Sequence, residues 1–248
     1  MKKNVLLAIG FLFLISPGAQ ATSSALFEEG NAKYHVGDFK AASESYQKLI
    51  ERGQATGAVY YNLGNAALKS GEKGRALVYY ERALKALPRD KDLRWNIHIL
   101  QEALPDRIED TSYFAIASLR DFLSRWSVNE IAILFSVFLA VLTILTLTSI
   151  FFPAIKPWTS WIGSLAVLGL LVVTPFFGFK VWEMKDPQAV VLDKETYAYY
   201  GPSERETKAF LLHEGAYGKI IDKTDDWFYL VLPNKKMGWI RKNSCEVV

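Results

Sequence analysis

Residues 57–90 read GAVYYNLGNAALKSGEKGRALVYYERALKALPRD, and they repeat the pattern of residues 23–56 at a spacing of 34 positions. The residues that recur at this spacing are small, aromatic or aliphatic: Gly30 with Gly64, Gly37 with Gly71, Ala42 with Ala76, Tyr46 with Tyr80, and Ile50 with Leu84. Small residues let two helices approach closely, a glycine permits the turn between them, and aromatic rings fill the gap between successive helix pairs. The stretch therefore predicts two helix–turn–helix units, over residues 23–56 and 57–90.

A third copy begins at Trp95-Asn96-Ile97, which aligns with Tyr61-Asn62-Leu63, but it ends after one predicted helix over residues 90–104. Such a helix caps the end of a stack of repeats. The pattern resembles the tetratricopeptide repeat family, whose unit is a helix–turn–helix of about 34 residues. The resemblance implies an all-α solenoid over residues 22–104. Two positions depart from the family pattern: Lys33 replaces an aromatic residue in the first repeat, and Lys73 stands where one would follow Gly71.

The composition excludes several classes of protein. The chain has 248 residues, of which 50% are hydrophobic and 22% are charged, with a formal net charge of +3. Its 15 Phe, 12 Tyr and 7 Trp exclude a disordered chain, and the nearly balanced charge argues against nucleic acid as a partner. The single cysteine, Cys245, excludes an intramolecular disulfide and a cysteine-based zinc site.

Much of the hydrophobic content lies in segments that enter membranes. Residues 1–21 combine Lys2 and Lys3 with an apolar core and small residues at Ala19-Gln20-Ala21, which predicts a secretory signal peptide; the alternative is an uncleaved anchor. Residues 131–155 and 157–179 contain no ionisable side chain, and each exceeds the about 20 residues that a transmembrane helix needs. They predict two transmembrane helices, with tryptophans as interfacial anchors: Trp158, Trp161 and Trp182.

Two rules disagree on the topology of these spans. Basic residues flank the outer ends of the hairpin (Arg120, Arg125, Lys180 and Lys185), and Lys156 alone lies within it, which favours cytoplasmic flanks. The signal peptide favours export, and we give it precedence because long domains translocate largely regardless of charge. We therefore expect a two-pass protein of the bacterial inner (cytoplasmic) membrane with both soluble domains on the periplasmic side. Residues 105–130 predict an amphipathic linker helix that lies on the bilayer or packs against the repeats.

Residues 187–248 contain five short strand-like segments separated by turn signals, which predicts a small antiparallel barrel. The segment resembles the bacterial SH3 family in four motifs: Tyr199-Tyr200-Gly201-Pro202-Ser203, His213-Glu214-Gly215, Asp226-Trp227-Phe228-Tyr229-Leu230 and Gly238-Trp239-Ile240. The resemblance implies a tight turn at Gly215 and places Trp239 in the penultimate strand. The expected fold class is thus α followed by β: a tetratricopeptide repeat solenoid, two transmembrane helices and a C-terminal all-β SH3-like barrel.

No constellation of residues predicts catalysis. The three histidines, His35, His98 and His213, lie in separate contexts, and no pair has metal-ligand spacing on one helix. The glycines do not gather into a phosphate loop, and neither span carries a charge in its interior, which argues against a transporter. We therefore expect no enzyme activity, no metal and no cofactor.

Two sets of residues are candidates for binding. Four asparagines recur on the first helix of each unit, which lines the inner groove of such repeats: Asn31, Asn62, Asn65 and Asn96. Their amides can hold the backbone of an extended peptide, or they can join neighbouring helices. Some family members capture a terminal carboxylate with added basic residues, but other residues stand at those positions here: Phe27, Trp95 and Ile99.

The second set is aromatic and lies on the predicted barrel: Tyr197, Tyr199, Tyr200, Trp227, Tyr229 and Trp239. These residues can form a groove for a Pro-rich or wall-derived peptide. Because strand residues alternate between two faces, half of them are expected to point into the core, with Trp227 or Phe228 as a core residue.

The order of the parts resembles BatE-like proteins of the Bacteroides aerotolerance operons. The resemblance implies a non-enzymatic envelope scaffold that acts in aerotolerance or oxidative stress. Its implied partners are von Willebrand factor A-domain membrane proteins and, indirectly, a MoxR-type AAA+ ATPase. The runner-up interpretation is a cell-wall-binding or envelope-sensing protein whose barrel holds peptidoglycan peptides.

Overall fold

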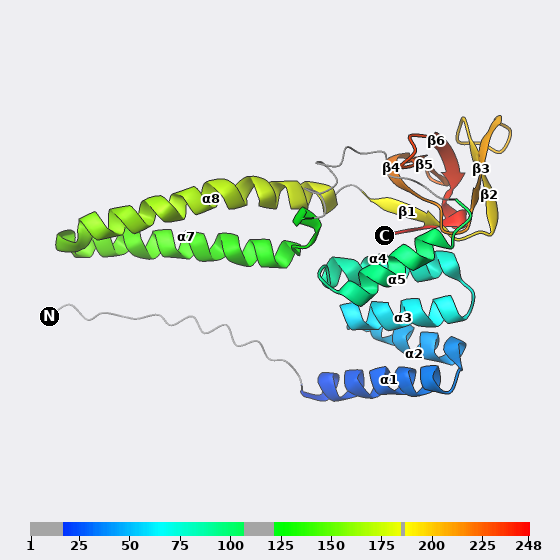
Figure 1. Ribbon diagram of the computed structural model, residues 1–248, viewed down its shortest axis with the longest axis horizontal. Coiled ribbons are helices and arrows are strands. Elements are labelled where there is room, and N and C mark those ends of the chain that lie inside the picture. Colours follow the sequence, from blue (N-terminus) through cyan, green and yellow to red (C-terminus); the bar gives the residue numbers. More distant parts are fainter. Residues whose placement is uncertain (1–16, 107–121, 185–186) are drawn as a thin grey trace.

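The computed structural model describes residues 17–106, 122–184 and 187–248, so most of the predicted signal peptide and linker helix lies outside the described residues. A stack of helices comes first: α1 (Pro17–His35), α2 (Phe39–Glu51), α3 (Gly57–Lys69), α4 (Lys73–Ala86) and α5 (Lys91–Glu102). A hairpin of α7 (Val128–Phe151) and α8 (Lys156–Met184) projects away from the stack, and a sheet lies against its α4–α5 end (Figure 1). The predicted order of helical and strand-rich parts is confirmed.

Close approach of the helices depends on glycines that lie against tyrosine rings. A Cβ atom on Gly64 would lie 2.5 Å from the Tyr80 ring, and one on Gly30 would overlap the Tyr46 ring in the same way. Both tyrosines are almost completely buried, with exposed fractions of 1% for Tyr46 and 0% for Tyr80. The turns within the two units contain glycines in the left-handed region of φ, Gly37 at 85° and Gly71 at 82°.

The hairpin helices are long and apolar enough to cross a membrane, with mean hydropathy of 2.6 and 2.1. Helix α7 begins at Val128, before the predicted span, because the Ser127 hydroxyl caps it and accepts from the Glu130 N–H at 3.2 Å. Helix α8 includes Pro157 in its first turn, where proline is tolerated, and continues past residue 179 to Met184. The helices thus differ in their bounds from the uncharged segments 131–155 and 157–179: α7 starts earlier and ends at Phe151, and α8 ends later.

The C-terminal part is a sheet of seven strands in which every pair is antiparallel. The strands are β1 (Gln188–Val191), β2 (Glu195–Tyr199), β3 (Lys208–His213), β4 (Tyr217–Lys223), β5 (Trp227–Val231), β6 (Met237–Arg241) and β7 (Cys245–Val247), in the spatial order β3-β2-β6-β5-β4-β1-β7. The prediction of five strands missed β3 and β7. Strand β3 lacks a clear polar–apolar alternation, and β7 has only three residues. Cys245 lies in the core of this sheet, and burial raises the pKa of its thiol to about 12.

The sheet packs directly on the last helices of the stack. One hydrophobic cluster contains Leu77 of α4, Leu100 of α5 and Val190 of β1. At the rim, Arg82 of α4 pairs with Glu246 of β7 at 2.8 Å and donates to the Val247 carbonyl at the same distance. The sheet thus covers apolar surface that the half repeat at α5 leaves open.

Candidate functional site

The four asparagines lie between helices of the stack. Asn31 Oδ1 accepts hydrogen bonds from the Tyr46 hydroxyl at 2.9 Å and from Asn62 Nδ2 at 3.0 Å, so it joins α1, α2 and α3. Asn65 Oδ1 accepts from the Tyr80 hydroxyl at 2.6 Å, and Asn96 Nδ2 donates to the Tyr61 hydroxyl at 3.0 Å. Of the two roles that the sequence left open, joining neighbouring helices is the one that this geometry displays.

A series of aromatic residues runs along the same inner helices at the repeat spacing: Phe27 on α1, Tyr61 on α3 and Trp95 on α5. The Phe27 ring lies 6.0 Å from the Tyr46 ring, and the Tyr61 ring lies 5.9 Å from the Tyr80 ring. Trp95 is 62% exposed, and Ile99 beside it on the next turn of α5 is 49% exposed. Trp95 and Ile99 are therefore two exposed apolar side chains one turn apart on α5.

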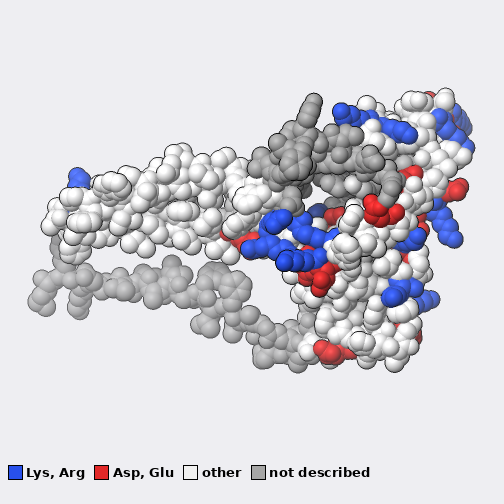
Figure 2. Space-filling view, in the orientation of Figure 1, with Lys and Arg blue, Asp and Glu red and all other residues white. Residues whose placement is uncertain are grey.

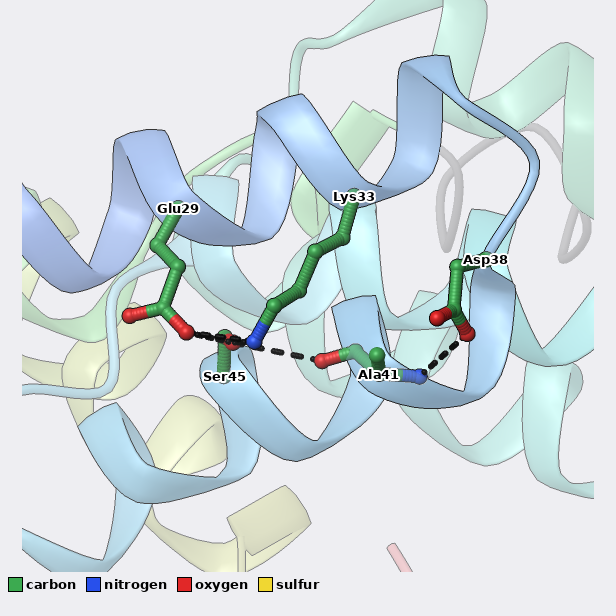
Figure 3. A network of polar contacts seen from close by, with 5 residues as sticks. All are labelled: Glu29, Lys33, Asp38, Ala41 and Ser45. Atoms are coloured by element: carbon green, nitrogen blue, oxygen red, sulfur yellow. Dashed lines mark hydrogen bonds and ion pairs between the residues drawn. The ribbon is translucent and has the colours of Figure 1, made fainter.

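A polar network explains the first departure from the repeat pattern (Figure 3). Lys33 pairs with Glu29 and donates to the hydroxyl of the buried Ser45 at 3.0 Å, and this hydroxyl donates to Glu29 at 3.2 Å. The hydrogen bond from Lys33 lowers the pKa of the Glu29 carboxyl. In the second unit the same three positions hold apolar or aromatic residues, namely Leu63, Ala67 and Tyr79. The first unit therefore ends in a polar surface, as the end repeats of solenoids do.

The aromatic residues of the sheet gather on one face. In the strand register Trp239 lies opposite both Tyr199 and Tyr229, and the Tyr229 and Trp239 rings stack at 5.0 Å. Trp227 lies opposite Arg241 on this same face, edge-on to Tyr199 at 5.5 Å. The core lies on the other face: Ala198, Leu230 and Ile240.

This register corrects the expectation that half of the aromatic set points into the core. Trp227 is only 6% exposed, but its cover comes from Tyr199 and the Arg241 guanidinium, which lies 5.3 Å from its ring centre. Phe228, its neighbour in the chain, packs against the core instead. Tyr200 beyond the end of β2 is 70% exposed.

Two cations border the aromatic face. Lys208 lies 3.7 Å from the ring centre of Tyr197, which is 39% exposed, and Arg241 also pairs with Glu204 at 2.7 Å. Aromatic rings with basic neighbours suit a peptide that carries apolar and acidic groups. Among the described residues no group of three or more His, Cys, Asp or Glu side chains is placed to hold a metal ion.

The motifs in the sequence do not predict the contacts that join the repeats to the sheet. Glu214 accepts a hydrogen bond from the Gly74 N–H at 2.7 Å and so caps the first turn of α4 across the contact. Asp106, just after α5, accepts from the His213 N–H at 2.7 Å and lies 3.1 Å from its Nδ1. In the sequence the signal for this contact is Gly74, because the first unit has Lys40 at the equivalent position.

Comparison with known proteins identifies one part of the chain. Residues 57–90 match the tetratricopeptide repeat family. No curated protein matches the chain. Among solved structures, an NlpC/P60 family protein from Bacillus cereus ATCC 10987 is 19% identical, with 27% of this chain and 22% of that chain covered and a TM-score of 0.22. The chain thus spans about a fifth of that protein's length, and a likeness this small carries no argument about fold or function.

Proposed function

We propose that this chain is a non-enzymatic scaffold of the bacterial cell envelope that binds other proteins. The α7–α8 hairpin anchors it in the inner membrane, and the repeats and the sheet lie together on the periplasmic side. The match of residues 57–90 to the tetratricopeptide repeat family carries this proposal, because such repeats build extended surfaces for protein partners. The length and apolar character of α7 and α8 support the anchor.

The order of parts supports a narrower form of the proposal. Repeats, two apolar helices and an all-antiparallel sheet follow one another along the chain. The narrower form takes the chain as BatE-like, with the sheet as an SH3-like barrel. In this form the partners are von Willebrand factor A-domain membrane proteins and, through them, a MoxR-type ATPase, and the pathway is aerotolerance or the response to oxidative stress.

The inner surface of the repeats indicates what kind of segment it binds. Trp95 and Ile99 offer apolar contacts, whereas the asparagine amides are engaged between helices. A partner segment with aliphatic or aromatic side chains fits this surface better than a terminal carboxylate, which would need cations at these positions.

Replacing Trp95 with alanine should reduce partner binding about thirtyfold, the factor that corresponds to about 2 kcal/mol for a tryptophan at the centre of an interface. The measurement is crosslinking and affinity capture from native membranes with the full chain. Val36→Ala is the matched control, because Val36 is 80% exposed at the turn between α1 and α2. If Trp95→Ala and Val36→Ala recover the same membrane protein equally well, the scaffold proposal is contradicted. Recovery of cell-wall fragments alone contradicts it as well.

The aromatic face of the sheet favours a second candidate function, which is binding of peptidoglycan peptides. If the sheet binds them, the purified full chain sediments with cell wall, and Trp239→Ala and Tyr200→Ala abolish this sedimentation. Tyr200→Ala is informative because a side chain that is 70% exposed contributes little to folding. Trp95→Ala, on the repeats, should sediment like the unaltered chain. An unaltered chain that stays in the supernatant rules out wall binding.

A further inference from the structure

The contact between the repeats and the hairpin fixes one end of the helix stack at the level where α7 begins. Arg89, in the loop between α4 and α5, pairs with Glu130 in the first turn of α7, and its guanidinium lies 5.5 Å from the Trp126 ring centre. In the next helix Arg94 donates to the Ser124 hydroxyl at 3.2 Å. If α7 and α8 span a bilayer, this end of the stack lies at its surface.

The sheet makes a matching contact at the same open end of the hairpin, where α8 ends beside the start of α7 (Figure 1). Lys219 of β4 lies 5.1 Å from the ring centre of Trp182, near the end of α8. Tryptophans at the ends of membrane helices sit at the level of the lipid headgroups. Each soluble part therefore brings a cation to one of these two tryptophans, Arg89 from the repeats and Lys219 from the sheet.

The surface around the Arg89 contact carries slightly more cations than carboxylates. Figure 2 shows Lys and Arg side chains gathered where the apolar hairpin meets the rest of the molecule. Residues 85–94 and 122–130 contain five basic side chains, Lys85, Arg89, Lys91, Arg94 and Arg125. Their acidic side chains are Asp90, Asp92 and Glu130, and Glu81 lies one turn before Lys85 on α4, close enough to Lys85 and Arg94 to interact with both. Two of these carboxylates have local roles: Asp90 caps α5 by accepting from the Leu93 N–H, and Glu130 pairs with Arg89.

From this placement we infer that the α4–α5 loop and the helix ends beside it (residues 85–94), together with residues 122–130, bind the headgroups of anionic phospholipids. The lipids are those of the leaflet on this side of the membrane. The inference rests on the proposed membrane anchor. Basic residues next to a membrane span attract anionic lipids, and a guanidinium can donate several hydrogen bonds to one phosphate. A zwitterionic headgroup offers no net charge to this surface, so phosphatidylglycerol binds and phosphatidylcholine does so weakly.

The test uses the full chain purified in mild detergent, with short-chain phosphatidylglycerol, phosphatidylcholine of the same chain length, or inorganic phosphate added and bound ligand counted by native mass spectrometry. The variant K85Q/K91Q removes two exposed cations and leaves the contact between Arg89 and Glu130 in place. We expect its affinity for phosphatidylglycerol to fall about 25-fold, from about fivefold for each cation near a membrane surface. The control variant K40Q/K69Q removes two exposed cations at the opposite end of the helices and should change this affinity less than twofold.

Equal binding of the two lipids, or an equal affinity of both variants for phosphatidylglycerol, would overturn the inference. Inorganic phosphate that binds as tightly as phosphatidylglycerol would show a phosphate site instead of a lipid site. Extraction of native membranes with alkaline carbonate separates failure of the lipid site from failure of the proposed membrane anchor. A chain that stays in the membrane but shows no lipid preference disproves only the lipid site, whereas a chain released by carbonate disproves the anchor as well.

Discussion

Replacing Tyr80 with alanine is expected to lower the free energy of unfolding of the repeats by about 3–5 kcal/mol, the usual cost of removing a fully buried aromatic ring. The ring of Tyr80 is 0% exposed and fills the space that Gly64 leaves on the facing helix. Truncation leaves a cavity that the helices can close only in part, because Tyr61 and the rest of the cluster hold their positions. Urea denaturation followed by far-ultraviolet circular dichroism measures the loss.

Tyr80→Phe separates the ring from its hydroxyl. It removes only the hydrogen bond to Asn65 and should cost about 1 kcal/mol. Because burial raises the pKa of Tyr80, its contribution to stability is complete below the unfolded pKa of about 10 and is lost as pH rises through the folded pKa. The phenylalanine variant should therefore show a smaller loss of stability above pH 10 than the unaltered chain. Equal destabilisation by both substitutions would contradict a packing role for the ring.

Replacing Gly74 with valine is expected to separate the sheet from the repeats. A Cβ atom at this position would lie 2.6 Å from the Val191 carbonyl oxygen and 3.0 Å from Cγ of Glu214. Overpacking of this kind costs about 1–3 kcal/mol, and displacement of the Glu214 carboxylate removes a hydrogen bond worth about 1.5–3 kcal/mol. Hydrogen exchange of the β1 amides should become faster, while exchange in α1 and α2 stays unchanged.

Lys40→Val is the matched control, because Lys40 occupies the equivalent position in the first unit and is exposed. Glu214→Gln keeps the size of the side chain and weakens only the hydrogen bond, so it should accelerate exchange in β1 less than Gly74→Val does. If β1 exchanges at the same rate in Gly74→Val and Lys40→Val, the contact between the sheet and α4 does not contribute to stability.

The repeats could be predicted from sequence because their contacts recur at a fixed spacing. Tyr46 and Tyr80 each meet a glycine on the preceding helix, so one pair predicts the other. The contact between α4 and the sheet has no such recurrence, since Gly74 and Glu214 are separated by the hairpin. In the sequence this contact is visible only as a departure from the repeat pattern, because Lys73 and Gly74 replace Phe39 and Lys40 of the first unit.

Structure explains this departure in physical terms. Phe39 packs against Tyr34 at 5.2 Å, whereas Lys73 reaches the Ala103 carbonyl at the end of α5, and Gly74 leaves room for the sheet. Departures from a repeat pattern therefore mark positions where a repeat contacts something other than its neighbour.

The candidate sites could likewise be predicted from the sequence only in part. Spacing placed the four asparagines on the inner helices, but their hydrogen-bond partners follow from the distance between helices, which a sequence does not contain. Alternation predicted two faces for the sheet. The pairing of Trp239 with Tyr199 and Tyr229 decides that the aromatic rings share one face.

The polar network of Glu29, Lys33 and Ser45 also limits how copies of the chain can assemble. Helical repeats of this kind grow by adding one unit to the apolar edge of the last, and head-to-tail contacts that do not close produce filaments. At the first unit this edge carries an ion pair in place of Leu63 and Ala67, so a second copy that stacked there would have to strip water from charged groups. At the other edge the sheet packs against apolar residues of α4 and α5, among them Leu77 and Leu100. Stacking of a second copy is therefore disfavoured at the first unit by the ion pair and at the last unit by the sheet.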